Sequence, residues 1–115
     1  MAYGIRADFE AVREVAFGGV GAAYAALGTG TDDYIRIVSI INSTDADIYV
    51  STDGTTNHFR IASGTGQIID LTTNRASKAT GLFLERGTIF YQKHAGVAPT
   101  SGNLWIQTVF ADGGV

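Results

Sequence analysis

Strict alternation of apolar and polar residues is the clearest pattern in this chain. Residues 103–110 contain two alternating sets of side chains. One set is Leu104, Ile106, Thr108 and Phe110, and the other is Trp105, Gln107 and Val109. In residues 47–51 the pattern places Ile48 and Val50 inward, with Asp47, Tyr49 and Ser51 outward. Successive side chains of a strand point to opposite faces, so a period of two predicts half-buried strands in both segments.

The segment "YIRIVSIIN", residues 34–42, is β-branched and almost continuously apolar. Such a run is typical of a strand that is buried on much of both faces. One face carries Ile35, Ile37, Ser39 and Ile41, and the other carries Tyr34, Arg36, Val38 and Ile40. Turn-forming residues follow in "STDA", residues 43–46, so we expect a hairpin over residues 34–51.

Further strands are predicted by the same reasoning at 59–63, 67–73, 81–85 and 88–93. The last two, joined by Arg86-Gly87, predict a second hairpin, and residues 74–80 form a polar loop. Two apolar runs before Asp33 also favour strands. A short helix through Phe9, Val12 and Ala16 is the alternative there, although the glycines at 18, 19 and 21 would break a longer one.

Seven or eight short strands with frequent turn signals predict an all-β fold. We expect a single antiparallel β-sandwich or jelly roll over residues 12–112. Residues 1–11 lack a period and are expected to be a flexible N-terminal arm, and residues 113–115 a loose tail. No alternation of strands with helices is visible, which disfavours nucleotide-binding folds.

Composition narrows the possible functions. The chain has 115 residues, of which 17% are charged against about 25% in an average domain, with 15 glycines and one proline. A net charge of −3, with scattered basic residues, argues against direct binding of nucleic acid. Cysteine is absent, which excludes disulfides and thiolate chemistry. No apolar run reaches the ~18 residues of a membrane span and no signal peptide opens the chain, so we expect a soluble protein made in the cytoplasm.

The stretch "STDGTTNH", residues 51–58, is dense in polar side chains. Ser51, Asp53 and His58 supply the residue types of a catalytic triad, and His94 offers a second combination. No G-x-S-x-G motif accompanies them, however. Asp53-Gly54 is instead a strong turn signal, with Asn57 able to bond to the backbone of the connection. We therefore predict a structural turn at Asp53, Gly54 and Asn57, and no catalytic residue.

Metal and cofactor sites are also not expected. His58 and His94 are far apart in sequence, and no zinc-binding motif is present. Asp45, Asp47 and Asp53 could supply oxygen ligands, but their spacing does not match a calcium-binding loop. The glycine-rich segments lack both the third glycine of a dinucleotide-binding motif and a phosphate-binding lysine.

Aromatic residues leave one alternative open. Trp105 with Tyr49 and Tyr91 could form a platform on which a sugar stacks. Residues of this kind more often anchor a core or an interface.

Three longer stretches resemble a group of small virion structural proteins of tailed bacteriophages. They are "INSTDADIYVSTDGTTNH", "IIDLTTNR" and "GLFLERGTIFYQK". The opening "REVAFGGVGAAYAALGT" and the closing "APTSGNLWIQTVF" are similar to the first strand pair and the last strand of that group. The resemblance spans roughly residues 12–110.

The resemblance implies a compact jelly-roll subunit on the phage particle, without catalytic residues or cofactors. We expect a capsid decoration or cement protein that binds the major capsid protein, stabilises the assembled head and forms dimers or trimers. A neck, tail or fibre component is the first alternative, and a carbohydrate-binding adsorption module is the second.

Interface residues are expected among the arm and the aromatics. The candidates are Tyr3, Ile5, Phe9, Tyr34, Tyr49 and Trp105. The arm could become ordered only against the capsid or a second subunit, or it could be a frayed end without a role. Tyr34, Tyr49 and Trp105 contribute to an interface if they face outward and to the core if they face inward.

Overall fold

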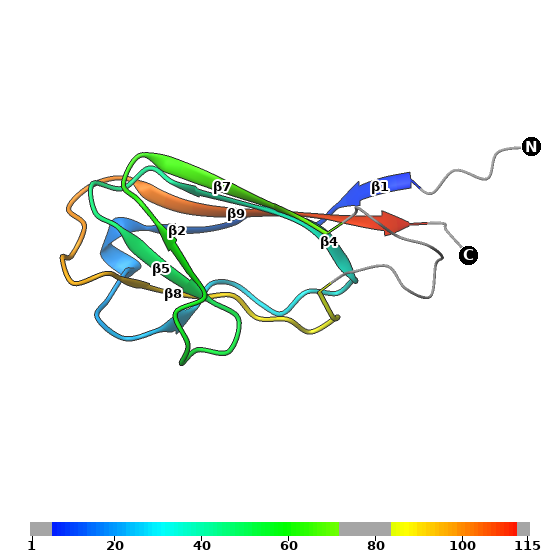
Figure 1. Cartoon of the computed structure of the whole chain (residues 1–115), viewed down its shortest axis with the longest axis horizontal. Coiled ribbons are helices and arrows are strands. Elements are labelled where there is room, and N and C mark those ends of the chain that lie inside the picture. Colours follow the sequence, from blue (N-terminus) through cyan, green and yellow to red (C-terminus); the bar gives the residue numbers. More distant parts are fainter. Residues whose placement is uncertain (1–5, 72–83, 113–115) are drawn as a thin grey trace, which may run out of the picture.

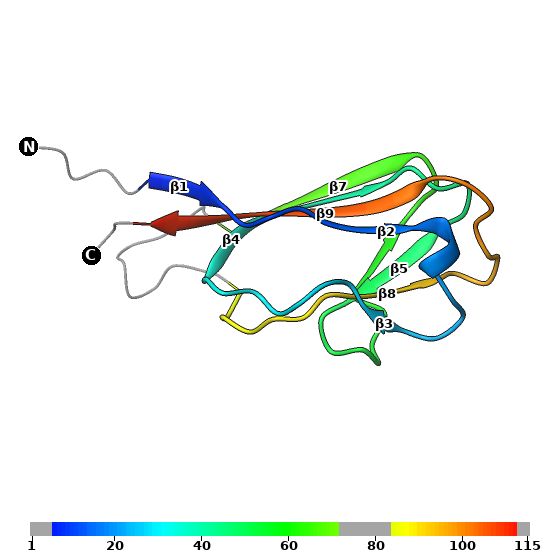
Figure 2. The same ribbon diagram turned by 180° about the vertical axis from the view of Figure 1, so that it is seen from behind.

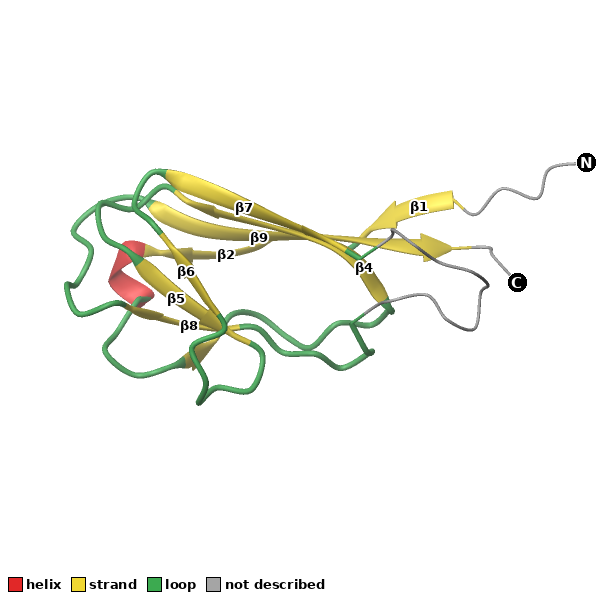
Figure 3. Ribbon diagram, viewed as in Figure 1, coloured by secondary structure: helices red, strands yellow, loops and turns green. Residues whose placement is uncertain are grey.

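The computed structural model describes residues 6–71 and 84–112, which form two antiparallel sheets packed face to face (Figures 1 and 2). Sheet A contains β1 (Arg6–Phe9), β2 (Arg13–Ala16), β4 (Ile35–Asn42), β7 (Thr65–Asp70) and β9 (Asn103–Asp112). Sheet B contains β3 (Ala25–Ala26), β5 (Ile48–Ser51), β6 (Phe59–Ile61) and β8 (Tyr91–His94). The helical content of these residues is one 3-10 turn, η1 (Phe17–Gly19), shown in Figure 3. The predicted all-β sandwich is confirmed.

The strand order is that of a jelly roll. Both β1 and β2 pair with β9, so that they act as one interrupted strand at the edge of sheet A. Sheet A then runs β1/β2–β9–β4–β7, and sheet B runs β3–β8–β5–β6. Successive strands belong to opposite sheets at every step from β2 to β9 except β5 to β6. Each crossing wraps the chain around the core, as in other double-sheet folds of this type.

The core lies between the sheets and follows the predicted alternation. Ile48 and Val50 of β5 are fully buried, as are Leu104 and Ile106 of β9. The other buried apolar side chains are Val20, Leu27, Ile35, Val38, Ile40, Ala46, Ile61 and Phe90. The inward face predicted for residues 47–51 is therefore confirmed, with one exception: Ser51 is buried rather than outward-facing. The alternation predicted for residues 103–110 is also present, with Leu104, Ile106 and Thr108 buried.

The hairpin predicted over residues 34–51 is wrong, because β4 and β5 belong to different sheets. The chain crosses the sandwich at residues 43–47, and the buried Asn42 holds this crossing. Its amide nitrogen donates to the carbonyls of Ala46 and Ile61, both at 2.9 Å. Its amide oxygen accepts from the backbone N–H and the hydroxyl of Thr44. Alternation along a strand indicates which side chains share a face, but it does not indicate which other strand pairs with it.

Strand β4 is buried on one face only, which differs from the expectation of burial on both. Ile40 and Val38 point into the core, whereas Ile41 is 37% exposed. A shift in the pairing register with β9 between Ile35 and Ile37 explains why Ile35 is also buried. A β-bulge of this kind inserts one residue and changes which side chains share a face.

The turn at Asp53-Gly54 connects β5 to β6, which pair antiparallel as predicted. Gly54 has a φ of +78°, in the left-handed region that favours glycine. A Cβ at this position would lie 3.4 Å from the ring of Tyr91. The backbone conformation therefore favours glycine here, while a Cβ alone would make an ordinary contact with the ring.

The N-terminal segment is more regular than an arm. Residues 6–9 form β1, and Arg6 pairs with Asp112 at the end of β9. The alternative helix through Phe9, Val12 and Ala16 is not formed, because residues 13–16 are strand β2. The first five residues and the predicted tail at 113–115 lie outside the described residues, as does the predicted loop at 74–80.

The second predicted hairpin, at 81–93, is also wrong where it can be compared. Leu84 bridges to Ile35 of sheet A, with reciprocal backbone hydrogen bonds of 2.8 and 3.0 Å. Strand β8 instead pairs with β3 and β5 in sheet B. Residues 81–83 of the hairpin lie outside the described residues.

Candidate interaction surface

The structure brings Ser51, Asp53 and His58 together, but as a turn. The Ser51 hydroxyl donates to Asp53 Oδ1 at 2.8 Å and accepts from the backbone N–H groups of Asp53 and Gly54, both at 3.1 Å. Asp53 Oδ1 also accepts from the N–H groups of Thr55 and Thr56, both at 2.8 Å. These backbone bonds, followed by that of Ser51, hold the pKa of Asp53 well below its ordinary value.

His58 completes this turn rather than activating a nucleophile. Its Nδ1 accepts from the backbone N–H of Thr52 at 3.0 Å, and its Nε2 lies 3.8 Å from Asp53 Oδ2. Nδ1 is 3.5 Å from the Ser51 hydroxyl, whose proton is directed to the Asp53 carboxylate. A serine nucleophile needs a free base and an accessible hydroxyl, and Ser51 is fully buried. The geometry therefore supports a structural role.

Asn57 has a different contact from the one expected. Its side-chain oxygen accepts from the hydroxyl of Tyr24 at 2.5 Å. This bond ties the loop at 51–58 to the segment before β3. Burial, and then the negative charge of Asp53, raise the pKa of Tyr24 above its ordinary value.

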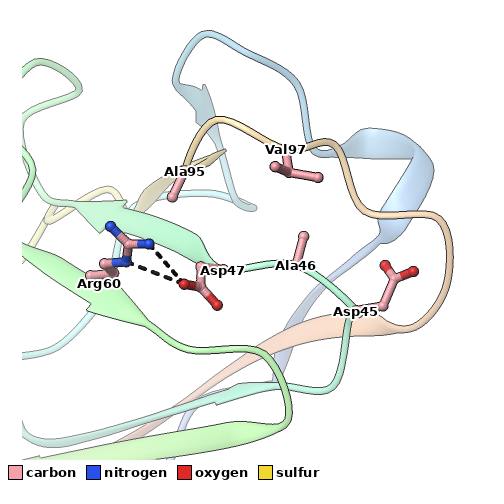
Figure 4. A pocket seen from close by; sticks show the side chains of 6 residues that line it. All are labelled: Asp45, Ala46, Asp47, Arg60, Ala95 and Val97. Carbon is pink, nitrogen blue, oxygen red and sulfur yellow. Dashed lines mark hydrogen bonds and ion pairs between the residues drawn. The ribbon is translucent and has the colours of Figure 1, made fainter.

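The three aspartates considered as metal ligands are used separately. Asp47 accepts from Arg60 at 2.8 Å and from the backbone of Ser63 at 2.9 Å, and Asp45 accepts from both the hydroxyl and the N–H of Thr100. These bonds lower the pKa of both carboxyl groups. Asp45 and Asp47 line a hollow of about 260 Å³, in which Figure 4 shows Asp45 apart from the Asp47–Arg60 pair. Among the described residues, no group of three or more acidic, histidine or cysteine side chains could hold a metal ion.

The outer face of sheet B carries a row of aromatic and cationic side chains that contact one another. Lys93 and Arg60 lie directly opposite Tyr49 on its two neighbouring strands. Lys93 Nζ is 4.7 Å from the ring centroid of Tyr24 and 5.9 Å from that of Tyr49, and the Arg60 guanidinium is 5.7 Å from the Tyr49 ring. Each of these rings therefore lies within cation–π distance of a cationic side chain of the same sheet.

The proposed platform of Trp105, Tyr49 and Tyr91 is not assembled. Trp105 pairs with Ile41 on the outer face of sheet A, and Tyr49 faces outward on sheet B. The two sheets lie between them. Tyr91 packs near Gly54, under the loop at 51–58.

The outer face of sheet A is apolar over most of its width. The cross-strand register aligns Phe9 with Val109 and Ile37, Trp105 with Ile41, and Ser39 with Ile68. We call this the apolar face; its apolar side chains are Phe9, Ile37, Ile41, Ile68, Trp105 and Val109. Phe9 and Ile68 are 69% and 71% exposed, and the others are exposed in part. Among the described residues, Ser39 and Gln107 interrupt it, and Glu14, Asn103 and Asp70 lie at its margins.

The expected interface residues separate into different regions. Phe9 and Trp105 belong to the apolar face, Tyr49 lies in the row on sheet B, and Tyr34 is half exposed beside Arg86. Tyr3 and Ile5 lie outside the described residues. Sequence reasoning missed Ile37, Ile41, Ile68 and Val109 as surface residues: residues 34–42 were expected to be buried on both faces, and Ile68 and Val109 were not considered as interface candidates. The apolar side chains on both faces of residues 34–42 were the available signal.

A second hollow lies between the sheets. It has a volume of about 370 Å³ and is lined largely by apolar side chains of both sheets, with His58 and Thr52 from the turn loop.

The described part of the chain contains no helix with the length and apolar character needed to cross a membrane. Comparisons with known protein families, with curated proteins and with solved structures find no match to this chain.

Proposed function

We propose that this chain is a non-enzymatic structural subunit of a tailed-phage virion, which binds the assembled head and stabilises it as a decoration protein. The observation that carries the proposal is the apolar face of sheet A. The resemblance of residues 12–110 to small phage virion proteins supports a phage particle as its location. The closed hydrogen-bonding of the loop at 51–58 supports a non-enzymatic role.

The extent of the apolar face supports contact with another protein. Four strands at about 4.8 Å spacing and three side-chain rows at about 6.8 Å give an area on the order of 400 Å². Patches of this size on soluble proteins are often binding sites. Burying it would contribute on the order of 10 kcal/mol before the costs of association are subtracted. Such a surface suits a subunit that adheres to a shell by packing.

A decoration role also fits the remaining structure. The sandwich holds its loops with internal hydrogen bonds, as at Asn42 and Asp53, and needs no ligand to complete them. The major capsid protein is the expected partner. A rigid subunit with one apolar face can bridge neighbouring capsid subunits and oppose their separation under internal pressure.

Binding to purified shells tests this proposal. The protein is added to unexpanded and expanded heads, and the bound fraction is measured after sedimentation. We expect preferential binding to the expanded lattice. Absence from both kinds of shell, with recovery of the protein in tail fractions, would replace the decoration role with the neck or tail alternative.

Two variants locate the binding surface in the same assay. Ile41→Lys introduces a charge into the apolar face and should reduce shell binding at least tenfold. Val97→Lys is the matched control, because Val97 is 71% exposed in the loop that follows β8, away from the apolar face. Equal binding by both variants would show that the shell contacts another surface.

A further inference from the structure

Strand β7 forms one edge of sheet A, and its pairing with β4 fixes which backbone groups point outward. The N–H of Leu71 donates to the carbonyl of Arg36 at 2.8 Å, in register with Ile37 opposite Asp70. Hydrogen-bonded positions alternate along an antiparallel strand. Residues 67 and 69 therefore also direct their backbone groups toward β4, whereas the N–H of Thr65 donates to the carbonyl of Ala62 in the preceding turn. The N–H and C=O of Gly66 and Ile68 point away from the sheet.

Among the described residues, this edge lacks the features that usually prevent strands from pairing. Natural edge strands are protected by proline, by lysine, by bulges or by covering segments. The six residues of β7 include neither proline nor lysine, and Ile68 at the centre is 71% exposed. Within residues 6–71 and 84–112, no strand pairs with the outer side of β7.

We infer that two copies of this chain pair antiparallel through β7, across a twofold axis that passes beside Ile68. An antiparallel pair of identical strands is self-complementary, as a twofold interface requires. Ile68 and the partner's Ile68 would exchange two backbone hydrogen bonds. In this register Asp70 lies opposite the partner's Gly66, so the single charged side chain of β7 does not meet its own copy.

The pairing would also join the two apolar faces. Ile68 lies on the outer face of sheet A, directly opposite Ser39 of β4. Side by side, two copies would form one continuous sheet and present a single apolar surface of twice the width. This inference goes beyond the shell-binding role, since it concerns the chain alone in solution.

The pairing is expected to be weak for an isolated dimer. A six-residue strand is about 20 Å long, and one strand pair buries far less than the roughly 800 Å² per partner of a standard stable interface. A trapping measurement therefore suits it better than a size measurement at low concentration.

Single-cysteine variants provide that measurement, because the natural chain has no cysteine. Residues in a hydrogen-bonded antiparallel pair have Cα atoms about 5.5 Å apart, within the range of a disulfide. Ile68→Cys should form a covalent dimer under mild oxidation at least ten times faster than Val97→Cys. Val97 is the matched control, since it is equally exposed at 71%.

Ser39→Cys distinguishes edge pairing from stacking of the two apolar faces. Ser39 shares the outer face with Ile68 but lies one strand inside the edge. We expect it to cross-link as slowly as the Val97 variant. Cross-linking as fast as the Ile68 variant would overturn edge pairing in favour of stacked faces, and equally slow reaction of all three variants would overturn it altogether.

The unmodified chain gives an independent readout. In a dilution series followed by ¹H–¹⁵N NMR, the Ile68 and Gly66 amide signals should shift with protein concentration, and that of Val97 should not. No shift up to millimolar concentration would overturn the inference. Neither measurement involves shells, so failure here is distinguishable from failure of the decoration role.

Discussion

The two outer faces of this sandwich differ in how far their side chains contact other side chains of the same protein. On sheet B, Lys93 lies between two tyrosine rings, Arg60 pairs with Asp47, and the loop at 51–58 closes over the end of β5. On sheet A, the outer face ends in apolar side chains without a covering layer among the described residues. Side chains that contact one another stabilise the fold, whereas an uncovered apolar face is available to another protein. The same architecture thus combines one face whose side chains contact one another with one apolar face, which we propose as the binding face.

Substitution of Asn42 tests the crossing between the two sheets, and it should have the largest effect on the free energy of unfolding. Asn42→Ala removes two donated and two accepted hydrogen bonds in a fully buried site. Buried carbonyls left without donors cost about 1–3 kcal/mol each, so we expect a loss of about 3 kcal/mol in the free energy of unfolding. Urea denaturation measures it.

Asn103→Ala is the control for that substitution. Asn103 also lies in sheet A, but its side chain makes one exposed hydrogen bond, to Glu14. Its loss should cost no more than about 0.5 kcal/mol. Equal losses for both asparagines would contradict the role assigned to the buried crossing.

Gly54 tests the loop that closes sheet B. Gly54→Val places a β-branched side chain at a φ of +78° and against the Tyr91 ring, so we expect a loss of about 2 kcal/mol or more in stability. His58→Ala removes one acceptor from an exposed backbone N–H and should cost about 1 kcal/mol or less. Thermal unfolding of the two variants compares them directly, and a larger loss for His58→Ala would argue that the histidine, rather than the turn, holds the loop.

One substitution on each face tests the comparison itself. Tyr49→Ala removes the ring contacted by Arg60 and Lys93 and should cost about 1–2 kcal/mol of stability without weakening shell binding. Ile68→Ser should cost about 0.5 kcal/mol or less, because the side chain is mostly exposed, but should weaken shell binding. Urea denaturation and shell sedimentation of both variants measure the two effects. The reverse pattern would show that the two faces have the opposite roles.

The smallest effect on stability is expected when the pH is lowered. The pKa of Asp53 is lower in the folded protein than the value of about 3.9 for an unfolded chain, so the folded state binds fewer protons between the two values. Its stabilisation is therefore complete above about pH 5 and is lost as the pH falls through the unfolded and then the folded value. The denaturation midpoints of Asp53→Asn and the natural chain should converge as the pH falls from 5 to 2. A constant difference would rule out this linkage.

The sequence allowed the alternation of side chains to be predicted for a few strands, but not the partners of those strands. Alternation in residues 47–51 identified Ile48 and Val50 as core side chains, and Asp53-Gly54 identified the turn between β5 and β6, which pair in sheet B. The crossing at residues 43–47 was not recognised, because turn-forming residues serve hairpins and crossings alike. A buried asparagine at the end of an apolar strand was the remaining signal.

The apolar face of sheet A was not recognised from the sequence for a related reason. The sequence pattern around an isoleucine on a strand is the same whether its side chain packs against the second sheet or against another protein. In β4 the bulge between Ile35 and Ile37 also shifts the phase of the alternation, so that Ile35 and Ile40 share a face although their spacing is odd. Only three-dimensional pairing separates Ile40, in the core, from Ile41, at the surface.

The pairing of β1 with the end of β9 has a mechanical consequence. Arg6 lies opposite Asp112, so the two ends of the folded chain leave the sheet at the same place (Figure 1). A force that separates the chain ends would load the hydrogen bonds between these strands one after another and peel them apart at low tension. A force spread across the broad face of sheet A would be carried by all its strands at once. A protein of this shape therefore resists a force better when the force acts on the broad face of sheet A than when it acts on the chain ends.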